Sequence, residues 1–314
     1  MPLPQLKKLS DTLWELPSTF KKGMNVPAHF YATEPLIKTM DEAVFQQAAN
    51  VACLPGIQKA SLCMADGHSG YGFPVGGVAA FDPEDNGIIS PGGVGFDVNC
   101  GMRLLTTNLT VDEVKPRIKD IVNELFKRVP TGVGCKGKIA LTQRTMREVL
   151  QGGARWAVEN GYGWEKDLHS IEDDGVLEGA NEKEVSAKAA GRGMNQLGTL
   201  GSGNHYLEVQ LVTPENIVRK TMAKKFGIKQ DHVVLMLHCG SRGTGHQICS
   251  EYTTRFLTTH KKLNDSLPDK ELASAPFHSK EGQAYYSAMK CAANFALANR
   301  QVITHRIRET LSKV

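Results

Sequence analysis

The chain has 314 residues, of which 41% are hydrophobic and 22% are charged, and its formal net charge is +4. This composition excludes a disordered protein, whereas so mild a charge argues neither for nor against a nucleic-acid partner. We find no apolar run of membrane-spanning length and no secretory signal, and seven scattered cysteines without a CxxC pair are typical of reduced thiols. We therefore expect a cytoplasmic protein with no membrane partner.

Short apolar runs between glycine-rich stretches predict β-strands. In chain order these runs are 74–81, 87–90, 102–107, 205–211 and 233–237. Glycine is concentrated in the stretches 67–101, 191–203 and 240–245. Such clusters between apolar runs indicate functional loops on a rigid scaffold.

Two helices are predicted in the first half of the chain. Thr110 and Glu113 have the spacing of a capping box, and apolar residues then recur at helical intervals as far as Val129. Residues 144–151 predict a second helix, which we expect to end at the glycine pair 152–153.

A long final helix is predicted from Glu281 onward, because apolar residues recur at helical spacing as far as Leu311. Its polar pair, Asn299 and Arg300, costs burial energy unless both side chains find partners. His305 we interpret as a helix-surface residue. Because helices and strands interleave without regular alternation, we expect a mixed α/β (α+β) architecture rather than a barrel or a Rossmann sheet.

Asp97 and Cys100 lie three positions apart in a glycine-rich stretch. Glycines let the backbone approach a ligand closely, and a carboxylate combined with a thiolate suits a borderline divalent ion. The pair alone is a weak signal, because a single cysteine is more often a small buried hydrophobe. Two histidines in similar settings strengthen the metal interpretation.

His205 follows a Gly-Ser-Gly-Asn stretch and opens an apolar run, and His238 ends such a run before Cys239 and Gly240. Strand ends that lead into glycine loops are where α/β proteins place ligands. The alternative for each histidine is a satisfied core residue. Arg242 is either a phosphate contact beside glycine amides or the surface residue of a tight turn.

Asp66 and His68 lie in a further glycine-rich stretch, 64–74. They are either partners that orient metal ligands from outside or simple turn residues.

Five segments together resemble the RtcB family of RNA-splicing ligases, in the family's order. They are ADGHSGYGFPVGG (65–77), GVGFDVNCGMR (93–103), GSGNHYLE (201–208), HCGSRG (238–243) and ANRQ (298–301). The likeness runs from about Trp14 to the last residue, and it is far more specific than a single glycine motif.

The resemblance implies an RtcB-like fold, with sheets and helices around a polar metal-binding cleft. It also implies a ligase that joins RNA 3′-phosphate or 2′,3′-cyclic phosphate ends to 5′-hydroxyl ends, in tRNA splicing or RNA repair. GTP and manganese would be its cofactors. RNA would be its substrate, and an activator protein would be a further partner.

By the same resemblance, four side chains would hold two Mn²⁺ ions. Cys100 would bridge both ions, Asp97 and His205 would complete one, and His238 would hold the other. GTP would be contacted by Asn204, His205, Tyr206, Leu207 and Glu208.

The family also carries two motifs that this sequence lacks. One is a His-Asn motif with the last manganese ligand, and the other is a Ser-His-Gly-Ala-Gly-Arg-type motif with the histidine that becomes guanylylated. We therefore assign no catalytic residue, and we interpret residues 1–314 as the N-terminal and central part of a single RtcB-like catalytic domain. We expect this chain to bind metal weakly and not to guanylylate itself.

Two other functions fit the same ligands. A dinuclear metal-dependent phosphoesterase would use them to activate water. A non-catalytic metal- and RNA-binding fragment would show salt-dependent RNA affinity without turnover.

Overall fold

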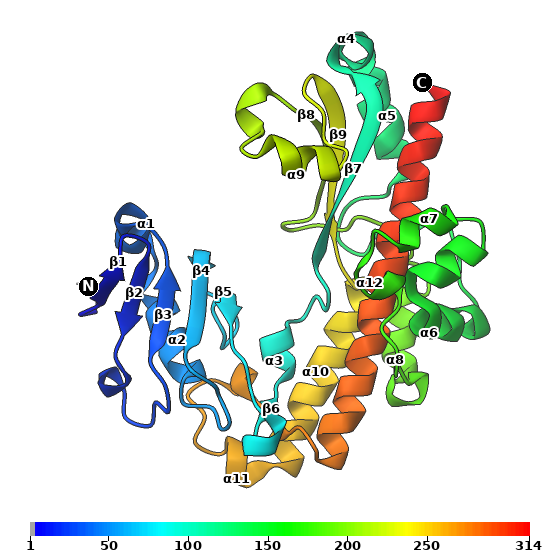
Figure 1. Ribbon diagram of the computed structural model, residues 1–314. Helices are drawn as coiled ribbons and strands as arrows, with labels where there is room; N and C mark the ends of the chain where they lie inside the picture. Colours follow the sequence, from blue (N-terminus) through cyan, green and yellow to red (C-terminus); the bar gives the residue numbers. More distant parts are fainter. Residues whose placement is uncertain (1–3) are drawn as a thin grey trace. The chain divides into compact units, whose positions relative to one another are not determined.

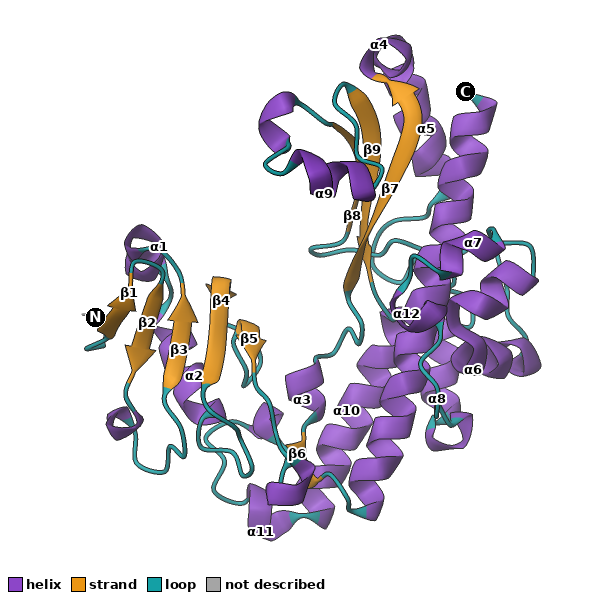
Figure 2. Ribbon diagram, viewed as in Figure 1, coloured by secondary structure: helices purple, strands orange, loops and turns teal. Residues whose placement is uncertain are grey.

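The computed structural model describes residues 4–314 and divides the chain into two compact units (Figure 1). The first unit holds the residues up to 96 together with 249–286, and the second holds 97–248 and 287–314. Helices α10 (Arg242–Thr259) and α12 (Lys280–Lys313) contribute residues to both. The predicted mixed α/β architecture is confirmed, with strands in each unit (Figure 2). That these residues form part of one catalytic domain stays a prediction.

The first unit is built on a five-stranded sheet in the order β1-β2-β3-β4-β5. Its strands are β1 (Lys7–Ser10), β2 (Leu13–Leu16), β3 (Ala28–Tyr31), β4 (Ser61–His68) and β5 (Val75–Val78). Only β3 and β4 pair in parallel. A parallel pair needs a crossover, and the chain supplies it through α1 (Glu34–Thr39) and α2 (Glu42–Val51). Phe30 and Phe45 meet in the core, with ring centroids 4.8 Å apart.

Short elements complete the first unit. Strand β6 (Ile88–Ile89) pairs antiparallel with β10 (Ala275–Pro276), and α3 (Pro91–Val94) and α11 (Lys261–Asn264) are single helical turns. The predicted strands 74–81 and 87–90 are present but shorter than expected, as β5 and β6.

The second unit is built on a three-stranded antiparallel sheet in the order β7-β9-β8. Its strands, β7 (Gly101–Thr110), β8 (Tyr206–Leu211) and β9 (His232–Cys239), confirm three predicted runs. Their side chains alternate between the two faces of the sheet. One face packs into a core where Leu235 and Leu237 of β9 join Ile303 and Ile307 of α12. The other face carries His238.

The second unit also contains helices. They are α4 (Val111–Val114), α5 (Ile118–Arg128), α6 (Gln143–Glu159), α7 (Glu165–Leu168), α8 (Ala187–Gly193) and α9 (Lys220–Lys225), together with parts of α10 and α12. None of the helices within residues 4–314 combines the length and the apolarity that crossing a bilayer requires.

The predicted helix from Thr110 to Val129 is interrupted. Its capping box is confirmed, because the Thr110 amide donates to Glu113 Oε2 at 2.8 Å. A 3₁₀ turn, Lys115–Arg117, separates α4 from α5, and Pro116 stands in it. Proline lacks the N–H that a continuous α-helix would use, so the single helix predicted here is wrong.

The second predicted helix does break at the glycine pair, although the helical span α6 continues to Glu159. Gly153 has non-helical torsions, φ 54° and ψ −137°, which separate two helical segments within α6. A Cβ atom at position 153 would overlap with the carbonyl oxygen of Gly175. Gly153 therefore ends the first helical segment and also allows close contact with Gly175.

The long final helix is confirmed as α12, which has 34 residues. His305 lies on it but is half-buried, and its ring packs edge-on against Tyr162 with centroids 5.7 Å apart. The expectation of a surface histidine is therefore wrong.

Candidate metal centre

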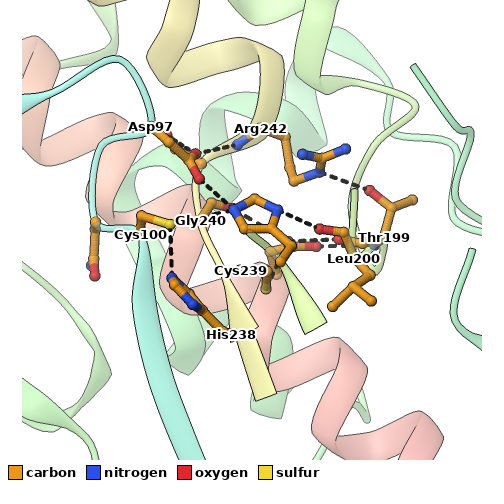
Figure 3. A network of polar contacts seen from close by, with 12 residues as sticks. Asp97, Cys100, Thr199, Leu200, His238, Cys239, Gly240 and Arg242 are labelled. Carbon is orange, nitrogen blue, oxygen red and sulfur yellow. Dashed lines mark hydrogen bonds and ion pairs between the residues drawn. The ribbon is translucent and has the colours of Figure 1, made fainter. Parts of the chain in front are cut away.

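Cys100 lies in the loop that leads into β7, and its sulfur sits between two imidazoles (Figure 3). Sγ is 3.0 Å from Nε2 of His238 and 3.3 Å from Nε2 of His205. The loop turns sharply, because the Cys100 amide donates to the Asp97 carbonyl at 3.0 Å and Asn99 has a φ of 55°. This turn directs the carboxylate and the thiol into one place.

His205 is oriented by both of its ring nitrogens. Nδ1 lies 2.8 Å from the carbonyl oxygen of Leu200, and Nε2 lies 2.7 Å from Oδ2 of Asp97. A carbonyl oxygen can only accept, so Nδ1 carries a hydrogen and Nε2 of the neutral ring keeps its lone pair. That lone pair and the carboxylate face each other at close range, so they need a proton or a cation between them.

Asp97 is held by the segment that follows β9. Its Oδ1 accepts from the Arg242 amide at 3.2 Å and from Ser241 Oγ at 3.3 Å. Burial acts to raise the pKa of Asp97, but its close contacts with His205 and Cys100 and the nearby positive charge of Arg242 outweigh it, so the pKa is lowered. A Cβ atom at Gly240 would lie 2.5 Å from Oδ2, so a side chain at that position would displace the carboxylate.

His238 is the penultimate residue of β9 and shares a rung of the sheet with Met102 of β7 and Tyr206 of β8. The Tyr206 ring packs edge-on against the imidazole, with centroids 5.4 Å apart. Burial lowers the pKa of His238, and nearby His205 lowers it further. His238 therefore favours the neutral state that binds metals.

The side chains of this cluster fit divalent metal ions, and they form two groups that share Cys100. Asp97, Cys100 and His205 place their ligand atoms within 4.8 Å of one another. His238 joins the group through its contact with Cys100, and its ring centroid lies 5.6 Å from that of His205. Carboxylate, imidazole and thiolate together suit a borderline ion. Burial and the Asp97 carboxylate raise the pKa of the Cys100 thiol, and a bound cation would offset this by stabilising the thiolate.

Arg300 of α12 ties together the two segments that carry Cys100 and His238. Its guanidinium donates to the carbonyl oxygens of Asn99 at 2.7 Å and Cys239 at 2.8 Å, and also to Asn99 Oδ1 at 2.8 Å. The sequence predicted that Arg300 would need hydrogen-bond partners if it were buried, and these three acceptors are its partners. Each of them directly adjoins a ligand in the sequence.

Asn299 holds the segment that precedes His205. Its Oδ1 accepts from the amides of Gly198 at 2.7 Å and Thr199 at 3.1 Å, and its Nδ2 donates to the Thr199 carbonyl at 3.0 Å. The same nitrogen donates to the Gly240 carbonyl at 3.3 Å. The sequence indicated that Asn299 needs partners, but it carried no signal for which ones.

The segment predicted to contact GTP lies beside this cluster. Tyr206 and Glu208 share the sheet face of His238, and Asn204 is exposed. Leu207 faces the other way and packs against the hydrophobic core, so only its backbone is free to contact a ligand. The role of the segment in binding GTP stays a prediction.

Arg242 begins α10 with a φ of 55°, and its Nε donates to Thr199 Oγ1 at 3.2 Å. The backbone amide of Arg242 thus holds Asp97, and its side chain contacts Thr199 in the segment before His205. A contact between Arg242 and phosphate stays a prediction.

Asp66 and His68 belong to the first unit, where both lie on β4 rather than in a turn. His68 Nδ1 is 2.8 Å from the Asp66 carbonyl oxygen. Their role in orienting ligands also stays a prediction.

Comparison with known proteins identifies the family. The family model described as tRNA-splicing ligase RtcB matches residues 47–314. Proteins named tRNA-splicing ligase RtcB are 53% identical over 309 residues in Archaeoglobus fulgidus and 54% identical over 310 residues in Thermococcus kodakarensis. A protein from Entamoeba histolytica named RNA-splicing ligase RtcB homolog 1 is 42% identical over 309 residues.

These alignments cover nearly the whole of this chain but only part of each relative. The two archaeal alignments include 98% of this chain and 64% of the relative, and the Entamoeba alignment includes 94% and 58%. The chain thus spans less than two thirds of the length of the relatives it matches.

Proposed function

Because this chain belongs to the RtcB family, we propose that it supplies the metal-binding and nucleotide-binding part of an RNA ligase. The reaction would join RNA 3′-phosphate or 2′,3′-cyclic phosphate ends to 5′-hydroxyl ends, with GTP and Mn²⁺ as cofactors. The relatives' names specify ligases in tRNA splicing, which supports RNA as the substrate.

The position of Cys100 carries this proposal. Its sulfur contacts the imidazoles of His238 and His205, which do not contact each other through their ring nitrogens, and Asp97 lies on the His205 side alone. A thiolate in this position can bind two cations at once, one with Asp97 and His205 and the other with His238. A shared anion lowers the repulsion between the two cations.

The bound ions would hold a phosphoryl group and neutralise the charge on its attacking and leaving oxygens. The protein's own part is to place the ligands before the ions arrive. Leu200 fixes the tautomer of His205, the Arg242 amide and Ser241 fix Asp97, and Arg300 fixes the loop of Cys100 through Asn99. Supporting contacts of this kind raise the affinity of a site and set its geometry.

The nucleotide would lie beside His238, along the face that presents Tyr206 and Glu208. The Tyr206 hydroxyl lies 3.3 Å from the sulfur of Met102 and 3.4 Å from that of Met236, and donation of its hydrogen to either sulfur holds the ring over this face. The carboxylate of Glu208 is exposed and lies two residues further along the strand. An exposed acceptor suits the N–H groups of a guanine base.

Metal analysis of single variants tests the proposal. Cys100→Ala should lower bound manganese more than any other single substitution, because both ions lose a ligand. Cys135→Ala is a matched control, since that free thiol is half-buried and donates to the Pro130 carbonyl at 3.6 Å. Unchanged manganese in Cys100→Ala, with correct folding, would contradict the shared-thiolate site.

Titration calorimetry with GTP separates this function from a phosphoesterase. Manganese-loaded protein should bind GTP, and Glu208→Ala should weaken binding, whereas Glu159→Ala at the end of α6 should not. Metal-dependent cleavage of a simple phosphodiester that is indifferent to GTP would favour the phosphoesterase instead. We further propose a cytoplasmic location, which is supported by the seven cysteines, all of them free.

A further inference from the structure

The segment that joins β8 to β9 projects from the sheet as a small folded unit, residues 213–231, which we call the β8–β9 excursion. Its base is closed by two hydrogen bonds, from the Asp231 amide to the Val212 carbonyl at 2.9 Å and from the Val212 amide to the His232 carbonyl at 3.0 Å. Helix α9 forms its middle, and the Ile228 amide returns to the Ala223 carbonyl at 2.9 Å. These bonds give the excursion a defined shape.

The excursion concentrates the positive charge of the protein. It carries five cations and two carboxylates, a net +3, whereas the whole chain carries +4. The cations are all exposed, and none of them forms an ion pair with any residue between 4 and 314. They are Arg219, Lys220, Lys224, Lys225 and Lys229. Unpaired cations at this density attract a polyanion.

Apolar side chains lie among these cations in the excursion. Val218 is 90% exposed, Phe226 is 66% exposed and Met222 is 40% exposed. They line a shallow hollow of about 340 Å³ together with Arg219 and the half-buried Ile228. An apolar hollow lined in part by Arg219, in a segment that also carries four exposed lysines, presents a surface for a flat ring together with contacts for phosphates.

We propose that the β8–β9 excursion binds single-stranded RNA, with a base against Phe226 in the hollow and phosphates on the surrounding cations. This inference rests on the proposed function, because that function makes RNA the substrate. Bases stack on aromatic side chains whatever their sequence, and lysines and arginines follow the backbone. The contact would therefore serve any RNA strand, not one particular sequence.

Its place in the fold suits a strand whose end lies at the metal centre. Strands β8 and β9 connect the excursion to the metal centre. The excursion begins beside the pair Leu211 and Val233 at one end of these strands, and the pair Tyr206 and His238 lies at the other end. Five residue steps along a strand measure about 17 Å. About five stacked nucleotides, at roughly 3.4 Å each, cover that distance.

Other partners fit the excursion less well. Basic amphipathic helices that lie on membranes bury a continuous apolar face, and α9 has only six residues. An acidic peptide would form ion pairs with the cations, but it would provide no flat ring to stack on Phe226. Vesicles with anionic lipids and a poly-glutamate peptide therefore serve as probes for the two alternatives.

Fluorescence anisotropy with a labelled 12-nucleotide oligouridylate tests the proposal on the whole chain, without GTP or metal. Phe226→Ala should weaken binding by roughly 5- to 150-fold, because the loss of one stacked base has an effect of that size. Replacing both Lys224 and Lys225 by alanine should lower the salt slope by about 0.7 for each phosphate that the variant no longer neutralises. Phe126→Ala is the matched control, since Phe126 on α5 is 71% exposed and lies outside the excursion.

A Phe226→Ala affinity equal to those of the wild type and of Phe126→Ala would overturn the proposal. So would the absence of oligouridylate binding, or tighter binding to vesicles or poly-glutamate than to RNA. Because these measurements contain no manganese or GTP, they can succeed while metal loading fails. A failed ligase assignment and a failed RNA contact are thus distinguishable.

Discussion

Nε2 of His205 lies 2.7 Å from Oδ2 of Asp97, although the two residues are 108 positions apart in the chain. The contact depends on the opposite side of the imidazole, where Nδ1 donates to Leu200. It joins the loop before β7 to the start of β8 and forms the more complete side of the candidate metal centre.

Alanine substitutions of His205 and His238 should remove different numbers of bound ions. His238→Ala leaves Asp97, Cys100 and His205 together, so about one ion should remain bound. His205→Ala breaks that group and should lower the affinity for both ions. The ion beside Asp97 loses a ligand, and without that cation the shared Cys100 thiolate is less stable, so the ion beside His238 binds more weakly too. Chelator competition with manganese measures both effects. His169→Ala, which removes an exposed histidine, should match the wild type, and equal stoichiometries in the two ligand variants would contradict the two-sided site.

Gly240→Ala should weaken metal binding without unfolding the protein. The new Cβ would lie 2.5 Å from Asp97 Oδ2 and would force the carboxylate away from His205. We expect a loss of roughly 10- to 100-fold in metal affinity, as is typical when a group that orients a ligand is disturbed. Gly191→Ala is the control, because no atom lies within 4 Å of the Cβ that alanine would add there, and alanine favours its helix. Wild-type metal affinity in Gly240→Ala would show that Asp97 has freedom to move.

Asn299→Ala should destabilise the fold by about 3 kcal/mol, because it leaves the buried amides of Gly198 and Thr199 without their acceptor. Denaturant unfolding measures this change. Asn108→Ala, at an exposed position of β7, should change stability by less than about 0.5 kcal/mol. Equal stability of the two variants would mean that the segment before His205 is held by other contacts.

Asp167 should make stability depend on pH in acid. Its carboxylate accepts from Arg308 at 2.6 and 2.8 Å and from Gln301 at 2.9 Å. Burial acts to raise the pKa of Asp167, but these bonds and that from the Trp164 amide lower it to about 2. An unfolded aspartate has a pKa of about 3.9, so the stabilisation is complete above about pH 5 and is lost as the pH falls from about 4 to 2.

The variant Asp167→Asn isolates that effect. At about pH 7 it should be less stable than the wild type by about 2 kcal/mol, and the difference should shrink below about pH 4. Unfolding curves on either side of that pH give both values. A difference that stays constant with pH would assign the loss to packing instead of charge.

Much of the second unit could be predicted from the sequence, because its sheet strands are marked by apolar runs beside glycine loops. Cys100, His205 and His238 stand at or beside the ends of those runs, and Asp97 lies in the loop before one of them, so the structure brings them together where strand ends meet. Helix α10 was missed, since Ser241, Arg242 and Gly243 have the composition of a turn. Four strands of the first unit, β1 to β4, were also missed, because most of them have only four residues and carry too little periodicity to be recognised.

The supporting contacts of the site are harder to infer from sequence than its ligands. Asn299 and Arg300 are recognisable as polar residues in an apolar helix, but their acceptors lie as far as 201 positions away in the chain. Only tertiary packing decides which backbone groups meet them. Pro116 and Gly153 show a similar limit within single helices. A proline or a glycine in a helical pattern can either end the helix or be accommodated in it, and the sequence does not decide which.

The hydrogen bonds from Arg300 to Asn99 form late during synthesis of the chain. The loop of Cys100 leaves the ribosome about 200 residues before the side chain that secures it. At roughly 5 to 20 residues per second, that interval lasts about 10 to 40 seconds. Throughout it, the Cys100 thiol is open to oxidants and to any cation nearby, so if the proposed site binds metal, the ion can be chosen before folding is finished.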